Sequence, residues 1–244
     1  MSLHGNLLGI DTTFAAASAA VRVQREGCAP QTFLCYQEVR GGHAECLMDA
    51  IGSAMAQAAV DFSDMHALCV TAGPGSFTGT RVGIAAVRGL ALATGLPVYS
   101  ASSLAVIARR SILELEAQGG QVEANSIVVC TDARRGQIYF QLLTRFDQKP
   151  LTMPKIASAA SIVEEISRRN EPILLIASNG VDIAQSLLDL GVVFDQGPPA
   201  ALPSAEYLLD VHLEATHSPR PLYLRPPDAK AQSGKAIARQ RSEG

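Results

Sequence analysis

Two hairpins, each with a strand that ends in an aspartate, constrain the fold of this chain most strongly. Leu7–Ile10 is a short apolar run that ends at Asp11, and a small-residue, β-branched run returns over 15–23. The same order recurs where 127–131 ends at Asp132 and the chain returns over 137–143. Helical patterns follow the strands both times, which predicts a duplicated α/β unit.

The 244 residues are enough for two lobes of ordinary domain size. We expect an N-terminal lobe over 1–102, a C-terminal lobe over 103–225 and a loosely ordered tail over 226–244. Periodicity predicts further strands over 32–39, 68–70 and 173–177, and helices from His43, over 80–94, and near 103–118, 161–170, 181–190 and 204–216.

Composition excludes several classes of protein. Hydrophobic residues make up 48%, charged residues 18%, and the net charge is −3, which argue against disorder and against strong RNA binding by this chain alone. No apolar run reaches the roughly 20 residues of a membrane span, and we expect no secretory signal, because the N-terminus lacks a charged n-region followed by a long apolar segment. The five cysteines form no CxxC pair and the histidines no metal-ligand spacing. We therefore expect a cytoplasmic protein with reduced core cysteines and no metal.

The glycine-rich segment 73–79 lies between a strand and a helix N-terminus, where backbone N–H groups favour an anion. It lacks the lysine of a P-loop and its glycine spacing is not GxGxxG, so a tight strand-to-helix turn explains the glycines better than a nucleotide site does. The two aspartates can hold a magnesium phosphate or simply cap turns. The candidate vestigial nucleotide-binding residues are Asp11, Thr12, Gly73, Gly75, Ser76, Thr78 and Asp132.

Three further residues suggest catalysis only weakly. His43 and Glu45 can form an acid–base pair, but a single histidine at a helix start is also typical of capping or packing. Ser76 has no GxSxG turn around it, which argues against a serine hydrolase. We predict no catalytic residue.

The helix over 80–94 is apolar almost all round, since Arg81 and Arg88 are its only charged residues. Ala85, Gly89 and Ala93 lie on one face of it at a spacing of four residues. Either this helix is buried between the lobes, or its second apolar face binds a partner together with the helix that begins at His43.

The chain resembles the bacterial TsaB (YeaZ) family in segments that keep their order along most of the sequence. The most specific is 72–83, AGPGSFTGTRVG. It is supported by GIDT at 9–12, GHAE at 42–45, GLA at 89–91, TDARRGQIY at 131–139 and PLYLR at 221–225.

This resemblance implies an actin/Hsp70/sugar-kinase-like fold of two lobes. It also implies a non-catalytic scaffold role in making N6-threonylcarbamoyladenosine at position 37 of ANN-decoding tRNAs. Related TsaD would transfer the threonylcarbamoyl group, TsaE would supply an ATPase, and ATP or ADP and the metal would lie in those partners. The chain would reach tRNA only through the complex and would form a homodimer when alone.

The resemblance implies that the partner surface lies on the two N-lobe helices, at His43, Leu47, Met48, Ile51, Met55, Arg81, Val82, Ala85, Gly89 and Ala93. The sequence departs from actin-like phosphotransferases at the first hairpin, where Thr12-Thr13-Phe14 replaces the usual glycine beside the aspartate. That departure agrees with an inactive member. The alternative is a nucleotide-binding ATPase or phosphotransferase of the same superfamily.

Overall fold

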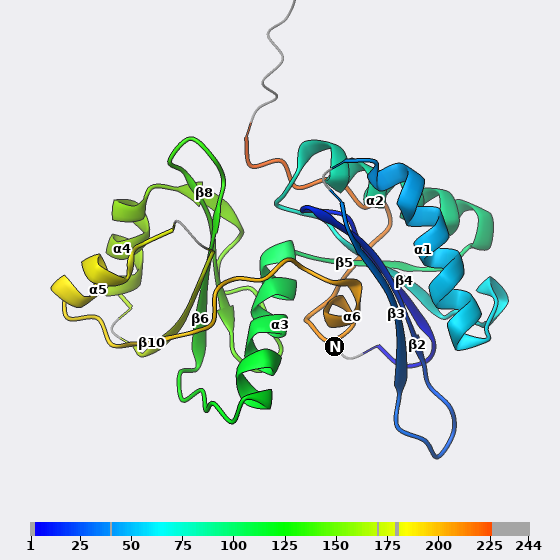
Figure 1. Cartoon of the computed structure of the whole chain (residues 1–244), viewed down its shortest axis with the longest axis horizontal. Helices are drawn as coiled ribbons and strands as arrows, with labels where there is room; N and C mark the ends of the chain where they lie inside the picture. The colour runs from blue at the N-terminus through cyan, green and yellow to red at the C-terminus, as the bar shows by residue number, and fades with distance from the viewer. Residues whose placement is uncertain (1–2, 40, 170, 179–180, 226–244) are drawn as a thin grey trace, which may run out of the picture.

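The computed structural model describes residues 3–39, 41–169, 171–178 and 181–225. These residues form two mixed β-sheets with helices on their faces, one in each half of Figure 1. The two-lobed α/β architecture expected from the sequence is therefore confirmed. The predicted tail over 226–244 lies outside the described residues.

The first sheet has the strand order β11-β5-β4-β1-β2-β3. Its strands are β1 (Leu7–Asp11), β2 (Ala16–Val23), β3 (Gln31–Glu38), β4 (Ala67–Thr71), β5 (Val98–Ala101) and β11 (Glu214–Thr216). β1 runs antiparallel to β2 and parallel to β4. Both β1 and β4 are buried along their whole length, because helices cover both faces of the sheet, and they accordingly read as continuous apolar runs.

Helices α1 (His43–Ala58) and α2 (Phe77–Thr94) pack against each other on one face of this sheet, and the short 3₁₀ helix η1 (Phe62–Asp64) follows α1 (Figure 1). Leu47, Ile51 and Met55 of α1 and Val87 of α2 are buried against Ile10 and Val70 of the strands. The helical spacing of these apolar residues thus serves the core of their own lobe.

The second sheet has the strand order β10-β9-β6-β7-β8. Its strands are β6 (Ser126–Asp132), β7 (Ile138–Thr144), β8 (Lys155–Ala157), β9 (Ile173–Ala177) and β10 (Phe194–Gln196). Helices α4 (Ala159–Ser167) and α5 (Ala184–Asp189) cover its outer face, where Ile162 and Leu187 are fully buried.

A central core joins the two sheets. Helix α3 (Ser103–Ala117) and the short helix α6 (Ala205–Leu208) lie between them (Figure 1). Leu104 and Ile107 of α3 share one buried cluster with Cys69 of the first sheet and with Val129 and Ile176 of the second. Since one apolar cluster contacts both sheets, the lobes form a single packed body.

The predicted helix over 204–216 is wrong. Only 205–208 is helical, and the chain then extends into β11, which pairs antiparallel with β5. Arg22 explains where the helix ends: it donates to the Leu209 carbonyl oxygen at 2.7 Å and forms an ion pair with Asp210, also at 2.7 Å. The carbonyl is thus occupied by a side chain, and the open edge of β5 offers the following residues a strand partner.

The predicted lobe 103–225 needs a second correction, because α6 and β11 return to the first sheet. The first lobe is therefore built from two separate stretches of chain. Helix α2 also begins earlier than expected, at Phe77, since the Ser76 hydroxyl oxygen accepts from the Gly79 N–H at 3.2 Å and caps the helix there. Strands β5, β8 and β10 were not predicted; each has only three or four residues.

Candidate functional site

The glycine-rich segment connects β4 to the N-terminus of α2, as the sequence predicts. The corner between β1 and β2 packs directly onto it. The Ser76 N–H donates to the Thr13 carbonyl oxygen at 2.6 Å, and the Thr12 hydroxyl donates to the Gly79 carbonyl oxygen at 2.7 Å. The same hydroxyl oxygen accepts from the Gly83 N–H at 3.0 Å. The Ser76 N–H, one of the donors that could hold a phosphate here, is thus bonded to the first hairpin.

The glycines of this loop are explained by the same contact. A Cβ atom at Gly75 would lie 2.1 Å from the Thr13 carbonyl oxygen, and one at Gly79 would lie 2.1 Å from the Thr12 carbonyl oxygen. Gly73 adopts a φ of 107°, which side chains disfavour. Gly75 and Gly79 therefore allow the backbone of the loop to approach the backbone of Thr12 and Thr13 closely.

Asp11 is fully buried, and its carboxylate is used inside the lobe. It accepts hydrogen bonds from the Thr13 N–H at 3.2 Å, from the Thr13 hydroxyl at 3.0 Å and from the Thr71 hydroxyl. Burial raises the pKa of Asp11 above its ordinary value, while the hydroxyl bonds of Thr71 and Thr13 oppose that shift. A carboxylate enclosed in this way does not face a cleft where it could bind magnesium.

His43 secures the other side of the same corner. Its Nε2 lies 2.8 Å from the Phe14 carbonyl oxygen, and because a carbonyl only accepts, Nε2 carries the proton. Phe14 packs against the central core between the sheets. His43 is only 8% exposed, so it holds the corner in place, whereas Glu45 of the suggested acid–base pair is exposed.

Asp132 ends β6 in the second sheet and is exposed. Its carboxylate accepts from the Arg134 N–H at 2.7 Å, and its own N–H donates to the Ser178 hydroxyl at 2.9 Å. The two aspartates that the sequence suggests as a pair for a metal phosphate thus differ in exposure, since Asp11 is fully buried and Asp132 is exposed.

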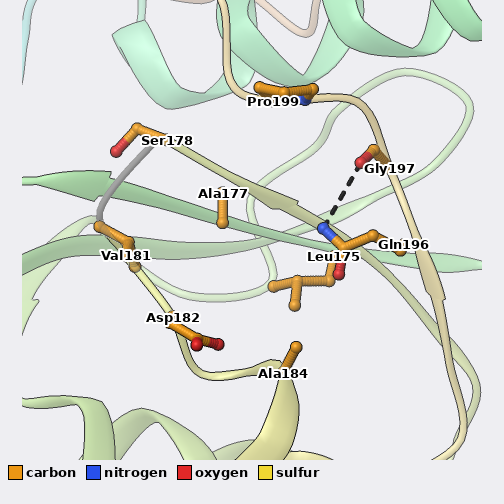
Figure 2. Close-up of a pocket in the computed structure, with 9 residues that line it drawn as sticks. All are labelled: Leu175, Ala177, Ser178, Val181, Asp182, Ala184, Gln196, Gly197 and Pro199. Atoms are coloured by element: carbon orange, nitrogen blue, oxygen red, sulfur yellow. Dashed lines mark hydrogen bonds between the residues drawn. The ribbon is translucent and has the colours of Figure 1, made fainter.

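A cavity of about 350 Å³ opens at the carboxyl end of β9 in the second lobe. Figure 2 shows Asp182 and Ser178 at its rim and Leu175 and Ala177 at its floor. Its lining residues are Leu175, Ala177, Ser178, Val181, Asp182, Ala184, Gln196, Gly197 and Pro199. None of the predicted nucleotide-binding residues lines it, and the described lining contains no arginine or lysine to hold a phosphate.

The structure corrects the predicted partner surface on α1. His43, Leu47, Ile51 and Met55 are buried in their own lobe and leave little surface for another protein. Met48, at 54% exposed, is the one predicted residue of this helix that faces outward. The sequence reasoning missed the row that is exposed beside it, Ala44, Gly52 and Ala56, which shares the four-residue spacing.

Most of the predicted partner residues on α2 are exposed, in contrast to those on α1. Arg81, Ala85, Gly89 and Ala93 are exposed, and a Cβ atom at Gly89 would meet nothing within 4 Å. Only Val82 is half-buried against the core. The alternative that this helix is enclosed between the lobes is therefore wrong.

We call these exposed rows on the two neighbouring helices the outer helix face. It comprises Ala44, Met48, Gly52 and Ala56 of α1 and Arg81, Ala85, Gly89 and Ala93 of α2.

Only two of the five cysteines are core residues. Cys69 and Cys130 are buried, but Cys28 is exposed and Cys35 and Cys46 are half-buried, so the expectation of five core cysteines is wrong. Among the described residues, no group of three or more metal-ligating side chains is found. Within the same residues, no helix has the length and apolarity needed to cross a bilayer.

Two mixed sheets, each starting with a strand–aspartate hairpin and separated by a central core, define a two-lobed protein of the actin/Hsp70/sugar-kinase-like class. Here the phosphate-type loop is occupied by the protein's own backbone. Residues 37–172 match the family model described as TsaD: tRNA N6-adenosine threonylcarbamoyltransferase. The chain belongs to this family, and within it to the TsaB (YeaZ) group.

Relatives cover nearly the whole chain. An uncharacterized protein of Mycobacterium tuberculosis is 33% identical over 92% of this chain and 93% of its own length. The tRNA threonylcarbamoyladenosine biosynthesis protein TsaB of Haemophilus influenzae is 25% identical over 90% of this chain and 93% of its own. The solved structure of YeaZ from Pseudomonas aeruginosa shares the fold, with a TM-score of 0.66, 23% identity, and coverage of 91% of this chain and 100% of that one.

Proposed function

We propose that this chain is a non-catalytic scaffold subunit in the synthesis of N6-threonylcarbamoyladenosine at position 37 of ANN-decoding tRNAs. Relatives named TsaB carry a role in tRNA threonylcarbamoyladenosine biosynthesis in their names, and the family model is that of the transferase TsaD. In this proposal a TsaD-type subunit transfers the threonylcarbamoyl group and holds the metal and nucleotide. TsaE joins the complex, and all three act in the cytoplasm.

The observation that carries the non-catalytic role is the hydrogen bond from the Ser76 N–H to the Thr13 carbonyl oxygen. It closes the loop that an ATPase of this fold would use for phosphate, and buried Asp11 removes the matching carboxylate. The competing function, a nucleotide-binding ATPase or phosphotransferase, needs both groups open to the cleft. No contact of the described residues favours it.

The scaffold role rests on the outer helix face. Small residues on two adjacent helices let another pair of helices approach closely, which is how helix bundles pack between proteins. We infer that a TsaD-type subunit binds this face. A second copy of this chain covers it when that subunit is absent, and tRNA is reached only through the complex.

Gly89→Arg tests this proposal, because the new side chain enters open space in the isolated chain and a helix partner in the complex. We expect a normal circular dichroism spectrum and a cooperative thermal transition, with at least about 100-fold weaker association with the TsaD-type subunit and with itself, since an unpaired charge would be buried. Gly89→Ala keeps the face small and should bind normally. Gln185→Arg, on an exposed position of α5, controls for added charge.

The outcome is decisive in either direction. A folded Gly89→Arg protein that binds like the wild type excludes the outer helix face as the partner surface. Reconstitution with the TsaD-type and TsaE-type subunits gives the second readout: modification of tRNA should require this chain and should fail with Gly89→Arg.

A further inference from the structure

The segment over 219–225, which we call the clasp, follows β11 and runs from beside α2 toward the gap between the two halves of Figure 1. It is attached first to the glycine-rich loop. The Leu222 N–H donates to the Ala72 carbonyl oxygen at 2.7 Å, and the Leu222 carbonyl oxygen would lie 3.3 Å from a Cβ atom at Gly73. The clasp is thus fixed to the loop that precedes α2.

The next clasp residue, Tyr223, is attached to the first turn of α2. Its ring centroid lies 5.3 Å from that of Phe77, and its hydroxyl oxygen accepts from Arg81 Nε at 2.5 Å. The Arg81 guanidinium also lies 3.7 Å above the Phe77 ring. Phe77 and Tyr223 are 46% and 45% exposed, so this cluster extends the outer helix face at its Arg81 end.

The last described clasp residue, Arg225, is attached to the other lobe. Its Nη2 donates to the Ala133 carbonyl oxygen at 3.1 Å and to Gln137 Oε1 at 2.5 Å, both in the turn between β6 and β7. Arg134 and Arg135 in this turn have φ angles of 65° and 56°, a left-handed conformation that costs non-glycine residues free energy. Arg225 therefore supports a turn that is unfavourable by itself.

From these contacts we propose that the clasp couples the outer helix face to the β6–β7 turn of the second lobe, so that partner binding and the order of this turn reinforce each other. The coupled partner is the TsaD-type subunit, so this part rests on the proposed function. A partner that covers Phe77 and Arg81 also immobilises Tyr223, and Arg225 is only two residues further along the chain. By thermodynamic linkage, loosening the turn end of the clasp must then weaken binding at the helix end.

Arg225→Ala in the isolated chain tests the link without any partner. Hydrogen exchange should accelerate over 133–137, where Arg225 is bonded, and also over 72–83, where it is not. Arg220→Ala is the matched control, since Arg220 is exposed in the same segment and makes no hydrogen bond or ion pair with the described residues. It should leave both regions unchanged. Acceleration confined to 133–137 would overturn the proposal.

Affinity for the TsaD-type subunit gives an independent readout. Arg225→Ala should weaken association by about 5- to 150-fold, the usual range of coupling between sites, and Arg220→Ala should not. Wild-type affinity of folded Arg225→Ala, beside loss of binding by Gly89→Arg, would overturn the clasp while leaving the scaffold role intact. If the wild type binds no such subunit, the scaffold role fails, and the exchange measurement still decides whether the clasp links the two regions.

Discussion

The backbone N–H of Ser76 donates to the carbonyl oxygen of Thr13 across 2.6 Å, which joins the start of α2 to the first hairpin. Helix N-termini after a glycine-rich turn commonly hold anions. Here the Ser76 N–H is bonded to the hairpin corner at Thr13. This donor of the loop thus stabilises the fold of the first lobe.

Two glycines of α2 give a matched test of this close approach. Gly79→Ala should destabilise the protein by about 1–3 kcal/mol or more, because its Cβ would meet the Thr12 carbonyl oxygen at 2.1 Å. Gly89→Ala should be neutral or stabilising by up to about 1 kcal/mol, since alanine favours the helix and nothing lies nearby. Urea denaturation of both variants measures the difference. Equal stabilities would show that the hairpin and loop are not in rigid contact.

Nucleotide should leave the stability of the isolated chain unchanged. A ligand at 100 times its dissociation constant raises the free energy of unfolding by about 2.7 kcal/mol, which thermal melting detects easily. Because the Ser76 N–H is already bonded to the hairpin and Asp11 is fully buried, millimolar magnesium ATP should not shift the melting temperature, and no ATP hydrolysis should be measurable. A saturable shift that disappears in Asp132→Ala would contradict this expectation.

Asp11 should make stability depend on pH in a defined direction. Burial raises its folded-state pKa above the ordinary 3.8, so the folded state binds the proton more tightly than the unfolded state. The stabilising contribution is present below the unfolded pKa and is lost as the pH rises through the folded pKa. Asp11→Asn removes this titration. The variant should therefore gain stability relative to the wild type as the pH increases from about 4, by at most about 1.4 kcal/mol per pH unit.

Urea denaturation at several pH values measures this difference. Asp132→Asn, a change at an exposed carboxylate, is the control and should track the wild type. A constant difference between Asp11→Asn and the wild type at every pH would show that Asp11 does not titrate differently in the folded state.

The five thiols should react in three groups. Cys28 is exposed and should be modified first by a thiol reagent, and half-buried Cys35 and Cys46 should follow more slowly. Burial raises the pKa of Cys69 and of Cys130 to about 12, so these two should react only after denaturation. Cys28→Ser should remove the fast phase. Rapid reaction of more than three thiols in the native protein would contradict the burial of these two.

The hairpin over 7–23, both helices of the first lobe and the glycine-rich turn could be predicted, because each has a strong local pattern. It could not be predicted that the apolar row on α1 packs into the core of its own lobe. His43, Leu47, Ile51 and Met55 have the spacing of both a core face and a partner face, and the more apolar row turns to its own sheet. The exposed row of small residues is the one that remains accessible on this helix.

The candidate site could not be predicted from the sequence where contacts between distant residues determine the structure. The sequence cannot show whether the carboxylate of Asp11 turns toward a cleft or toward Thr71, sixty residues away, which is where it is bonded. Likewise, the apolar residues over 205–213 have a pattern compatible with a helix. Arg22, from a distant strand, donates to the Leu209 carbonyl oxygen, and the helix ends at this point.

The pairing of β11 with β5 sets the order in which this protein can be completed during synthesis. β5 leaves the ribosome roughly 110 residues before β11 does. At about 5–20 residues per second, the edge of β5 therefore stays unpaired for on the order of ten seconds. During that interval the first sheet has an unpaired parallel strand at its border, a template for association with other nascent chains. Chaperone demand should therefore be concentrated in the first lobe.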